Sequence, residues 1–86
     1  MIGSLYGQVV YAHTSKPLEF ATIVVMYGAG PSPDIAPMTD IDGRFRLDEL
    51  PAGDWALRAH GPNGEVGEAT VRVSAGSAAT IVIQVI

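Results

Sequence analysis

Residues 39–55 read TDIDGRFRLDELPAGDW, and this stretch carries the strongest structural signal in the chain. Apolar and polar residues alternate on both sides of a Leu-Pro corner, which is typical of strands in a half-buried sheet. Phe45 and Leu47 share one face before the corner, and Trp55 and Leu57 share one face after it. The stretch therefore predicts two strands that contribute large side chains to one core.

The first five residues, TDIDG, have two interpretations. Asp40 and Asp42 stand two residues apart before a glycine, as oxygen ligands do in a calcium loop. In such a loop, however, the fifth position would be Arg44, and the twelfth, which requires a glutamate, would be Pro51. Aspartates also cap tight turns, and a glycine supplies the special dihedral. We therefore expect a turn, and keep a cation at Asp40 and Asp42 as the alternative.

The remainder of the chain is divided into short runs by ten glycines and six prolines. These runs are rich in Val, Ile, Thr and Tyr, which favour strands, and Asn63-Gly64 favours a hairpin turn. Short strands with regular turns predict an all-β fold, a seven-stranded Greek-key β-sandwich that forms one domain over residues 1–86. The predicted strands are 4–12, 19–28, 36–40, 44–49, 54–60, 65–74 and 79–86, with a loop at 28–37.

Alternation within each strand assigns a core face and an outer face. The predicted core comprises Leu5, Val9, Tyr11, Ala21, Ile23, Val25, Tyr27, Phe45, Leu47, Trp55, Leu57, Val71, Val73, Ile81, Ile83 and Val85. Six apolar side chains have the outward parity instead: Tyr6, Val10, Val24, Met26, Val82 and Ile86. Because a contiguous exposed apolar patch usually marks an interface, these six are the candidate interaction residues. The alternative is that they are scattered, or that the parity slips at a bulge such as Gly7.

Composition narrows the classes of partner. The net charge of −4 and the scattered cations argue against nucleic acid, and the absence of cysteine excludes a disulfide framework. No apolar run approaches the roughly 20 residues that would cross a bilayer, so membrane insertion is not expected. The opening residues lack the pattern of a signal peptide. These features predict a cytoplasmic protein if the 86 residues are the complete product, and give no location for an excised domain.

Five short blocks follow one another along the chain. They are Gly7-Gln8-Val9, Pro17-Leu18 before Ala21-Thr22-Ile23-Val24, the run from Thr39 to Leu47, the run from Leu50 to Leu57, and Ile81-Val82-Ile83-Gln84-Val85. Over nearly the whole chain this order resembles the carboxypeptidase regulatory-like domains, which belong to the transthyretin-like (prealbumin-like) β-sandwich class. The resemblance implies that the T-D-x-D-G-x-F block is a strand-connecting turn without a catalytic role. It also implies that Trp55 fills a core aromatic position and that the domain accompanies other protein parts.

Three classes of function remain. Nucleophilic catalysis needs a base within reach of the nucleophile, but His13 and His60 fall in a turn and at a strand end, where solvated histidines are common. Binding of calcium or carbohydrate is the alternative, although among the tyrosines and the tryptophan only Tyr6 has the outward parity. We expect a non-catalytic structural or protein-interaction module with a protein partner or a homo-oligomeric state. We expect no catalytic residue, cofactor or metal.

Overall fold

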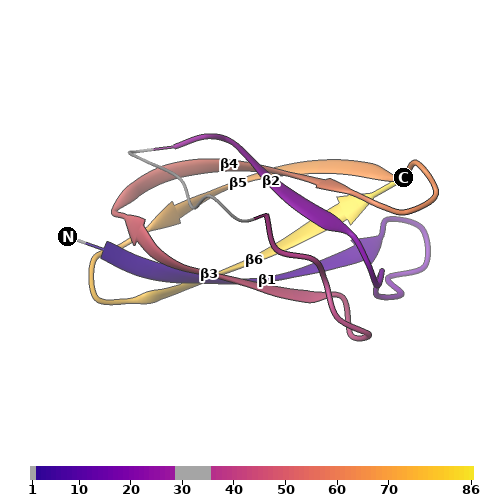
Figure 1. Ribbon diagram of the computed structural model, residues 1–86, viewed down its shortest axis with the longest axis horizontal. Helices are drawn as coiled ribbons and strands as arrows, with labels where there is room; N and C mark the ends of the chain where they lie inside the picture. Colours follow the sequence, from indigo (N-terminus) through magenta and orange to yellow (C-terminus); the bar gives the residue numbers. More distant parts are fainter. Residues whose placement is uncertain (1, 29–35) are drawn as a thin grey trace.

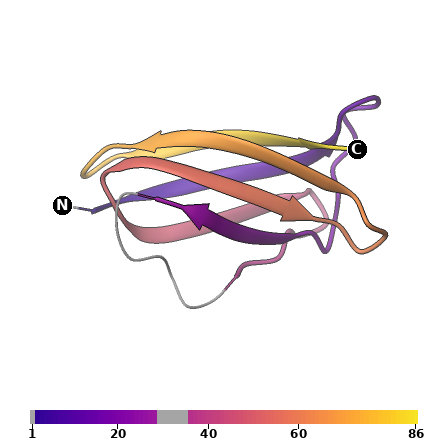
Figure 2. The same ribbon diagram turned by 90° about the horizontal axis from the view of Figure 1, so that it is seen from above.

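The computed structural model describes residues 2–28 and 36–86, which form six strands and no helix. The strands are β1 (Ile2–Tyr11), β2 (Thr22–Tyr27), β3 (Arg44–Pro51), β4 (Gly53–His60), β5 (Val66–Val73) and β6 (Ala78–Val85). They form two three-stranded sheets, with the orders β3-β1-β6 and β2-β4-β5. The two sheets pack face to face, and their strands follow the long axis of the molecule (Figures 1 and 2). The predicted all-β sandwich is therefore confirmed.

Each sheet has its own central strand. β4 pairs antiparallel with both β2 and β5, whereas β1 pairs antiparallel with β3 and parallel with β6. Two backbone hydrogen bonds of 3.2 Å join Val66 to Ile86, so the sheets are tied together where β5 begins and β6 has ended. β5 and β6 lie on the same side of the sandwich, and the turn that connects them joins the two sheets at the other end of these strands (Figure 2).

The main difference from the predicted strands lies around β2. The predicted strand 36–40 forms one isolated bridge, between Thr22 and Met38. Its backbone makes three hydrogen bonds to residues 20–23, through the Pro37 carbonyl and through the N–H and the carbonyl of Thr39. The predicted strand 19–28 begins later, at Thr22. Phe20 has a φ of 65°, which no extended strand can accommodate.

The core lies between the two sheets and agrees with the alternation in the sequence. Every predicted core residue except Tyr27 is in the buried cluster or packs against it. The largest fully buried side chains are Trp55, Leu5, Ile23, Leu50, Leu57, Ile83, Val9, Val73 and Val85. The side chains at the centre of this cluster come from both sheets, so burial of apolar area is the main force that holds the sandwich together.

Tyr27 is the one wrong core assignment. The β2–β4 register shifts between Val25 and Tyr27, so that Tyr27 lies opposite Ala56 and both side chains point out of the sandwich. Tyr27 is consequently 65% exposed. The next residue, Gly28, lies against the indole of Trp55, where a β-carbon would overlap the ring. The bulge thus turns the tyrosine outward before the chain crosses the tryptophan.

A polar contact ties the end of β1 to the residue that precedes β5. The hydroxyl of Tyr11 donates a hydrogen bond of 2.6 Å to Glu65 Oε2. This bond, with desolvation and the nearby carboxylate charge, raises the pKa of Tyr11 above its usual 10.0. The same bond, with backbone N–H groups including that of Asn63, lowers the pKa of Glu65 below its usual 4.5.

We expect the stabilisation from this pair to depend on pH in both directions. The lowered Glu65 pKa means that the contribution is present above pH 4.5 and is lost as the pH falls through the folded-state pKa. The raised Tyr11 pKa means that it is present below pH 10.0 and is lost as the pH rises through the folded-state pKa. Urea unfolding of the wild type and of Tyr11→Phe should differ at pH 7, and the difference should shrink as the pH falls below 4.5. Tyr27→Phe is the control, and an unchanged difference at pH 3 would contradict this assignment.

Candidate interaction face

The TDIDG stretch is a turn capped by its own first aspartate. Asp40 Oδ1 accepts hydrogen bonds of 2.9 Å from the N–H groups of both Asp42 and Arg44. Gly43 adopts a φ of 72°, and its N–H donates a hydrogen bond of 2.9 Å to the Asp40 carbonyl. These bonds confirm the predicted turn. Among residues 2–28 and 36–86, no three His, Cys, Asp or Glu side chains are grouped so that they could hold a metal ion.

Thr39 has a structural role that the sequence interpretation missed. Its side chain is buried, and Oγ1 donates to the Leu18 carbonyl at 2.6 Å while accepting the Ala21 N–H at 2.9 Å. The hydroxyl therefore joins the segment before β2 to the segment before β3. The only signal in the sequence was a threonine next to a capping aspartate, which does not reveal partners about 20 residues away.

The six candidate interaction residues do not form one patch. Tyr6 and Val82 lie on the outer face of β3-β1-β6, whereas Val24 and Met26 lie on the opposite sheet. Ile86 is exposed at the end of β6, where its backbone bonds Val66. The contiguity expected from parity alone is therefore wrong, because parity distinguishes inside from outside but not one outer face from the other.

Val10 was expected to be exposed, but it is only 8% exposed. Its strand has a neighbour on each side: Gln84 of β6, and Pro17, which forms an isolated bridge with Val10. The segment after β1 folds back along the strand, and its backbone bonds Val9 and Tyr11. Alternation alone assigns the Val10 side chain to solvent, but the neighbouring segments on both sides of the strand cover it.

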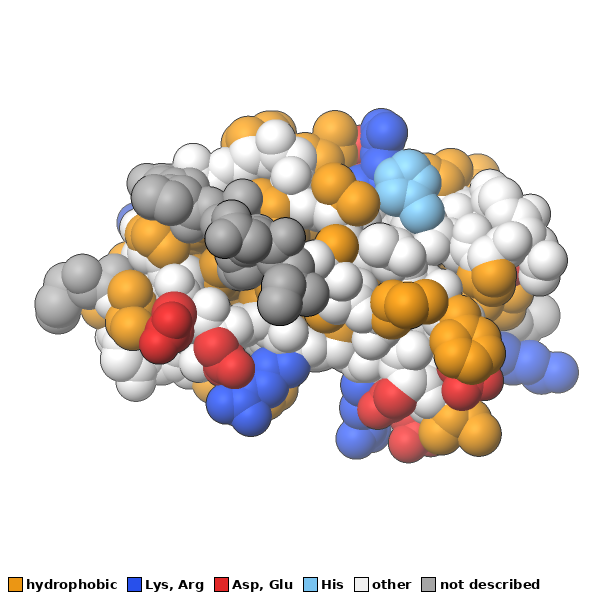
Figure 3. Space-filling model, viewed as in Figure 1, with side chains coloured by type: hydrophobic (Ala, Val, Ile, Leu, Met, Phe, Trp, Pro, Cys, Tyr) orange, Lys and Arg blue, Asp and Glu red, His pale blue; other side chains and the backbone are white. Residues whose placement is uncertain are grey.

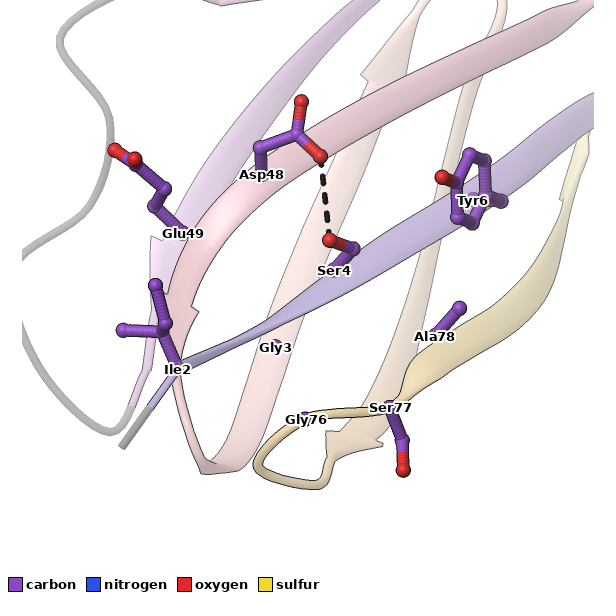
Figure 4. Close-up of a pocket in the computed structure, with 9 residues that line it drawn as sticks. All are labelled: Ile2, Gly3, Ser4, Tyr6, Asp48, Glu49, Gly76, Ser77 and Ala78. Carbon is purple, nitrogen blue, oxygen red and sulfur yellow. Dashed lines mark hydrogen bonds between the residues drawn. The ribbon is translucent and has the colours of Figure 1, made fainter.

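The outer face of β3-β1-β6 is largely polar. A hollow of about 560 Å³ lies near the start of β1. Figure 4 draws the residues that line it, which include Ser4, Asp48 and Glu49. Asp48 is already engaged, since it accepts a bond of 3.2 Å from Ser4 and one of 2.8 Å from Arg46. The Arg46 guanidinium also lies 5.2 Å from the centre of the Tyr6 ring. The charged and aromatic side chains of this face therefore already contact one another.

The side of the sandwich where β2 and β3 lie carries further exposed apolar side chains (Figure 3). Phe20, Met38 and Ile41 are exposed in the segments that precede β2 and β3. The Phe20 N–H bonds the Thr39 carbonyl, so these segments are neighbours. Acidic and basic side chains interrupt the apolar surface in this view.

The outer face of β2-β4-β5 offers the best-defined apolar surface with an ordered charge pattern. Val24, Met26 and Tyr27 of β2 are exposed, and the small residues Ala56 and Thr70 lie beside Tyr27. Met26, Tyr27, Ala56 and Thr70 border a hollow of about 320 Å³. Two ion pairs stand on either side of it: Arg58 with Glu68 at 2.8 Å, and Arg72 with Asp54 at 3.3 Å. We call this surface, made of these nine residues, the β4 outer face.

Comparison with known proteins identifies the family. The chain belongs to the carboxypeptidase regulatory-like domain family, whose model matches residues 4–85. None of the curated proteins compared with the chain matches it. The assignment confirms the resemblance read from the ordered blocks, and it agrees with the turn geometry of TDIDG.

Solved structures with the same fold include parts of larger proteins. The TIE protein of Bacillus anthracis has a TM-score of 0.75 and 20% identity, over 98% of this chain and 16% of its own. A variant of BcpA, the major pilin subunit of Bacillus cereus, has a TM-score of 0.69 and 12% identity, over 96% and 29%. A DUF3823 family protein from Parabacteroides merdae has a TM-score of 0.65 and 20% identity, over 98% and 45%. This chain therefore spans less than half the length of each.

Proposed function

We propose that this domain is a non-catalytic protein-interaction module, acting in self-assembly or as an accessory subunit, and that the β4 outer face is its contact surface. One observation carries the proposal: Val24, Met26 and Tyr27 are all exposed on the outer face of β2, and Met26 and Tyr27 border a hollow. Exposed apolar side chains grouped in this way mark interaction sites on soluble domains. The register shift that directs Tyr27 outward adds an aromatic ring, a residue type enriched at interfaces.

The family and the structural neighbours support the same role. The family is named as a regulatory-like domain, and one structural neighbour is described as a major pilin subunit. Within the residues that the structure describes, no helix could span a membrane. The two names favour contact with other protein surfaces as the function of the exposed sheet face.

The test compares the β4 outer face with the opposite outer face. The double substitution Val24→Glu/Met26→Lys adds one charge of each sign, so the net charge is preserved, and both side chains are exposed. We expect the fold to survive, as judged by circular dichroism, and the binding of protein partners to weaken. Val82→Glu, at an exposed position on β6, is the matched control.

Binding is measured with a photo-crosslinking amino acid at position 24 or at position 82, in extracts of the source organism. We expect crosslinked protein products from position 24 that disappear in the Met26→Lys background, and few from position 82. Equal products from both positions, or none from position 24, would contradict the proposed contact surface. Loss of the fold in the double variant would show that these side chains belong to the core.

A further inference from the structure

The charges on the β4 outer face follow a regular pattern. Along β4 the outward residues are Asp54, Ala56 and Arg58, and the residues opposite them on β5 are Arg72, Thr70 and Glu68. Positive and negative charges thus alternate at the corners of a rectangle whose centre is the uncharged Ala56–Thr70 pair. Both ion pairs are exposed to solvent, so each charge remains available to a second partner.

We propose that the partner of the β4 outer face is a second copy of this chain, packed face to face about a two-fold axis that crosses the strands at Ala56 and Thr70. The inference rests on the proposed function and names the partner. A two-fold interface must be complementary to itself. This axis places Arg58 of each copy over Asp54 of the other, and Glu68 over Arg72. All four corner charges then face opposite charges.

The alternative in-plane axis, parallel to the strands between β4 and β5, also brings opposite charges together. It places Arg58 over Glu68, but it leaves β2 of each copy beyond the edge of the other sheet, because β2 flanks β4 on one side only. The axis across the strands stacks β2 on β2 and brings Tyr27 of one copy against Tyr27 of the other. It therefore covers Tyr27, the most exposed apolar side chain of this face, and we assign it for that reason.

The size of the face sets the expected affinity. Three strands about 4.8 Å apart, with about eight residues at about 3.4 Å each, give a footprint of about 400 Å² per copy. A stable interface usually buries about 800 Å² on each partner, so this dimer should be weak, with a dissociation constant in the micromolar range or above. Exposed ion pairs are screened by salt, so the dissociation constant should rise between 50 mM and 500 mM sodium chloride.

The decisive variant exchanges one ion pair: Arg58→Glu/Glu68→Arg. The exchange preserves the net charge and the pairing within the chain. Across the proposed axis, however, the glutamate introduced at position 58 would face Asp54, and the arginine introduced at position 68 would face Arg72. We expect the dissociation constant to increase at least about tenfold, because like charges placed together are strongly unfavourable. Exchanging the second pair as well, with Asp54→Arg/Arg72→Asp, restores opposite charges everywhere and should restore dimerisation.

The measurement is sedimentation velocity of the purified chain from 5 µM to 1 mM. Arg46→Asp/Asp48→Arg, which exchanges an ion pair on the opposite outer face, is the control and should behave as the wild type. A monomeric wild type at every concentration would overturn the second-copy proposal, while crosslinks from position 24 to another protein would leave the proposed function standing. A dimer that tolerates the single exchange would overturn the proposed axis and the arrangement derived from it. Circular dichroism of each variant confirms that it is folded.

Discussion

Replacing Trp55 with alanine should lower the free energy of unfolding by about 3–5 kcal/mol, the usual cost of removing a large aromatic from a core. Trp55 is fully buried, and its indole N–H donates a hydrogen bond of 2.8 Å to the Pro51 carbonyl. Gly28 lies directly against the ring and has no side chain that could move into the cavity left by the indole. Small domains are usually stable by only about 5–15 kcal/mol, so this loss would be a large fraction.

Urea unfolding followed by circular dichroism measures this change, and Trp55→Phe separates its causes. Phenylalanine keeps most of the packing but leaves the Pro51 carbonyl without its donor, so we expect a smaller loss of about 1–3 kcal/mol. A Trp55→Ala variant as stable as the phenylalanine variant would mean that the site collapses around alanine. That result would contradict the rigid packing between Gly28 and the indole.

Gly43→Ala should lower the free energy of unfolding by about 2–5 kcal/mol, from two causes that add. The φ of 72° is left-handed and costs an L-residue about 1–2 kcal/mol. A β-carbon at Gly43 would also come within 2.5 Å of the Val9 carbonyl oxygen, and crowding of this kind costs about 1–3 kcal/mol. The turn cannot shift freely, because the Gly43 carbonyl accepts the Val9 N–H at 2.7 Å.

Gly76→Ala is the matched control for this substitution. Gly76 has nearly the same φ, 73°, but a β-carbon there would meet no atom within 4 Å. Its alanine variant should therefore lose only the dihedral part, about 1–2 kcal/mol. The difference between the two variants in urea unfolding reports the crowding against Val9. Equal losses would mean that the TDIDG turn relaxes away from β1.

The sandwich was predictable because its strongest signals are local. Alternation placed Phe45, Leu47 and Trp55 in the core, and Asp40 followed by Gly43 marked the turn; both required only the neighbouring residues. Tyr27 was misplaced because a register shift in β2 reverses the parity, and nothing in TIVVMY marks the extra residue. Such irregularities depend on what the strand packs against, here the indole of Trp55 beside Gly28.

The interaction face was only partly predictable. Val24 and Met26 were named correctly as exposed, but Tyr6 and Val82 lie on the other sheet, because strand order is decided by long-range pairing. The ion pairs of the β4 outer face escaped notice for the same reason. Arg58 and Glu68 are ten residues apart and meet only when β4 and β5 pair.

The parallel pairing of β1 with β6 has a mechanical consequence. Ser4–Tyr11 pair with Ala78–Val85, so the first and last strands lie side by side while the two ends of the chain emerge at opposite ends of the sandwich (Figure 1). Tension applied through the two ends would slide β1 along β6 and load all the hydrogen bonds between them at once. We expect these hydrogen bonds to resist such tension together, in shear, instead of breaking one at a time.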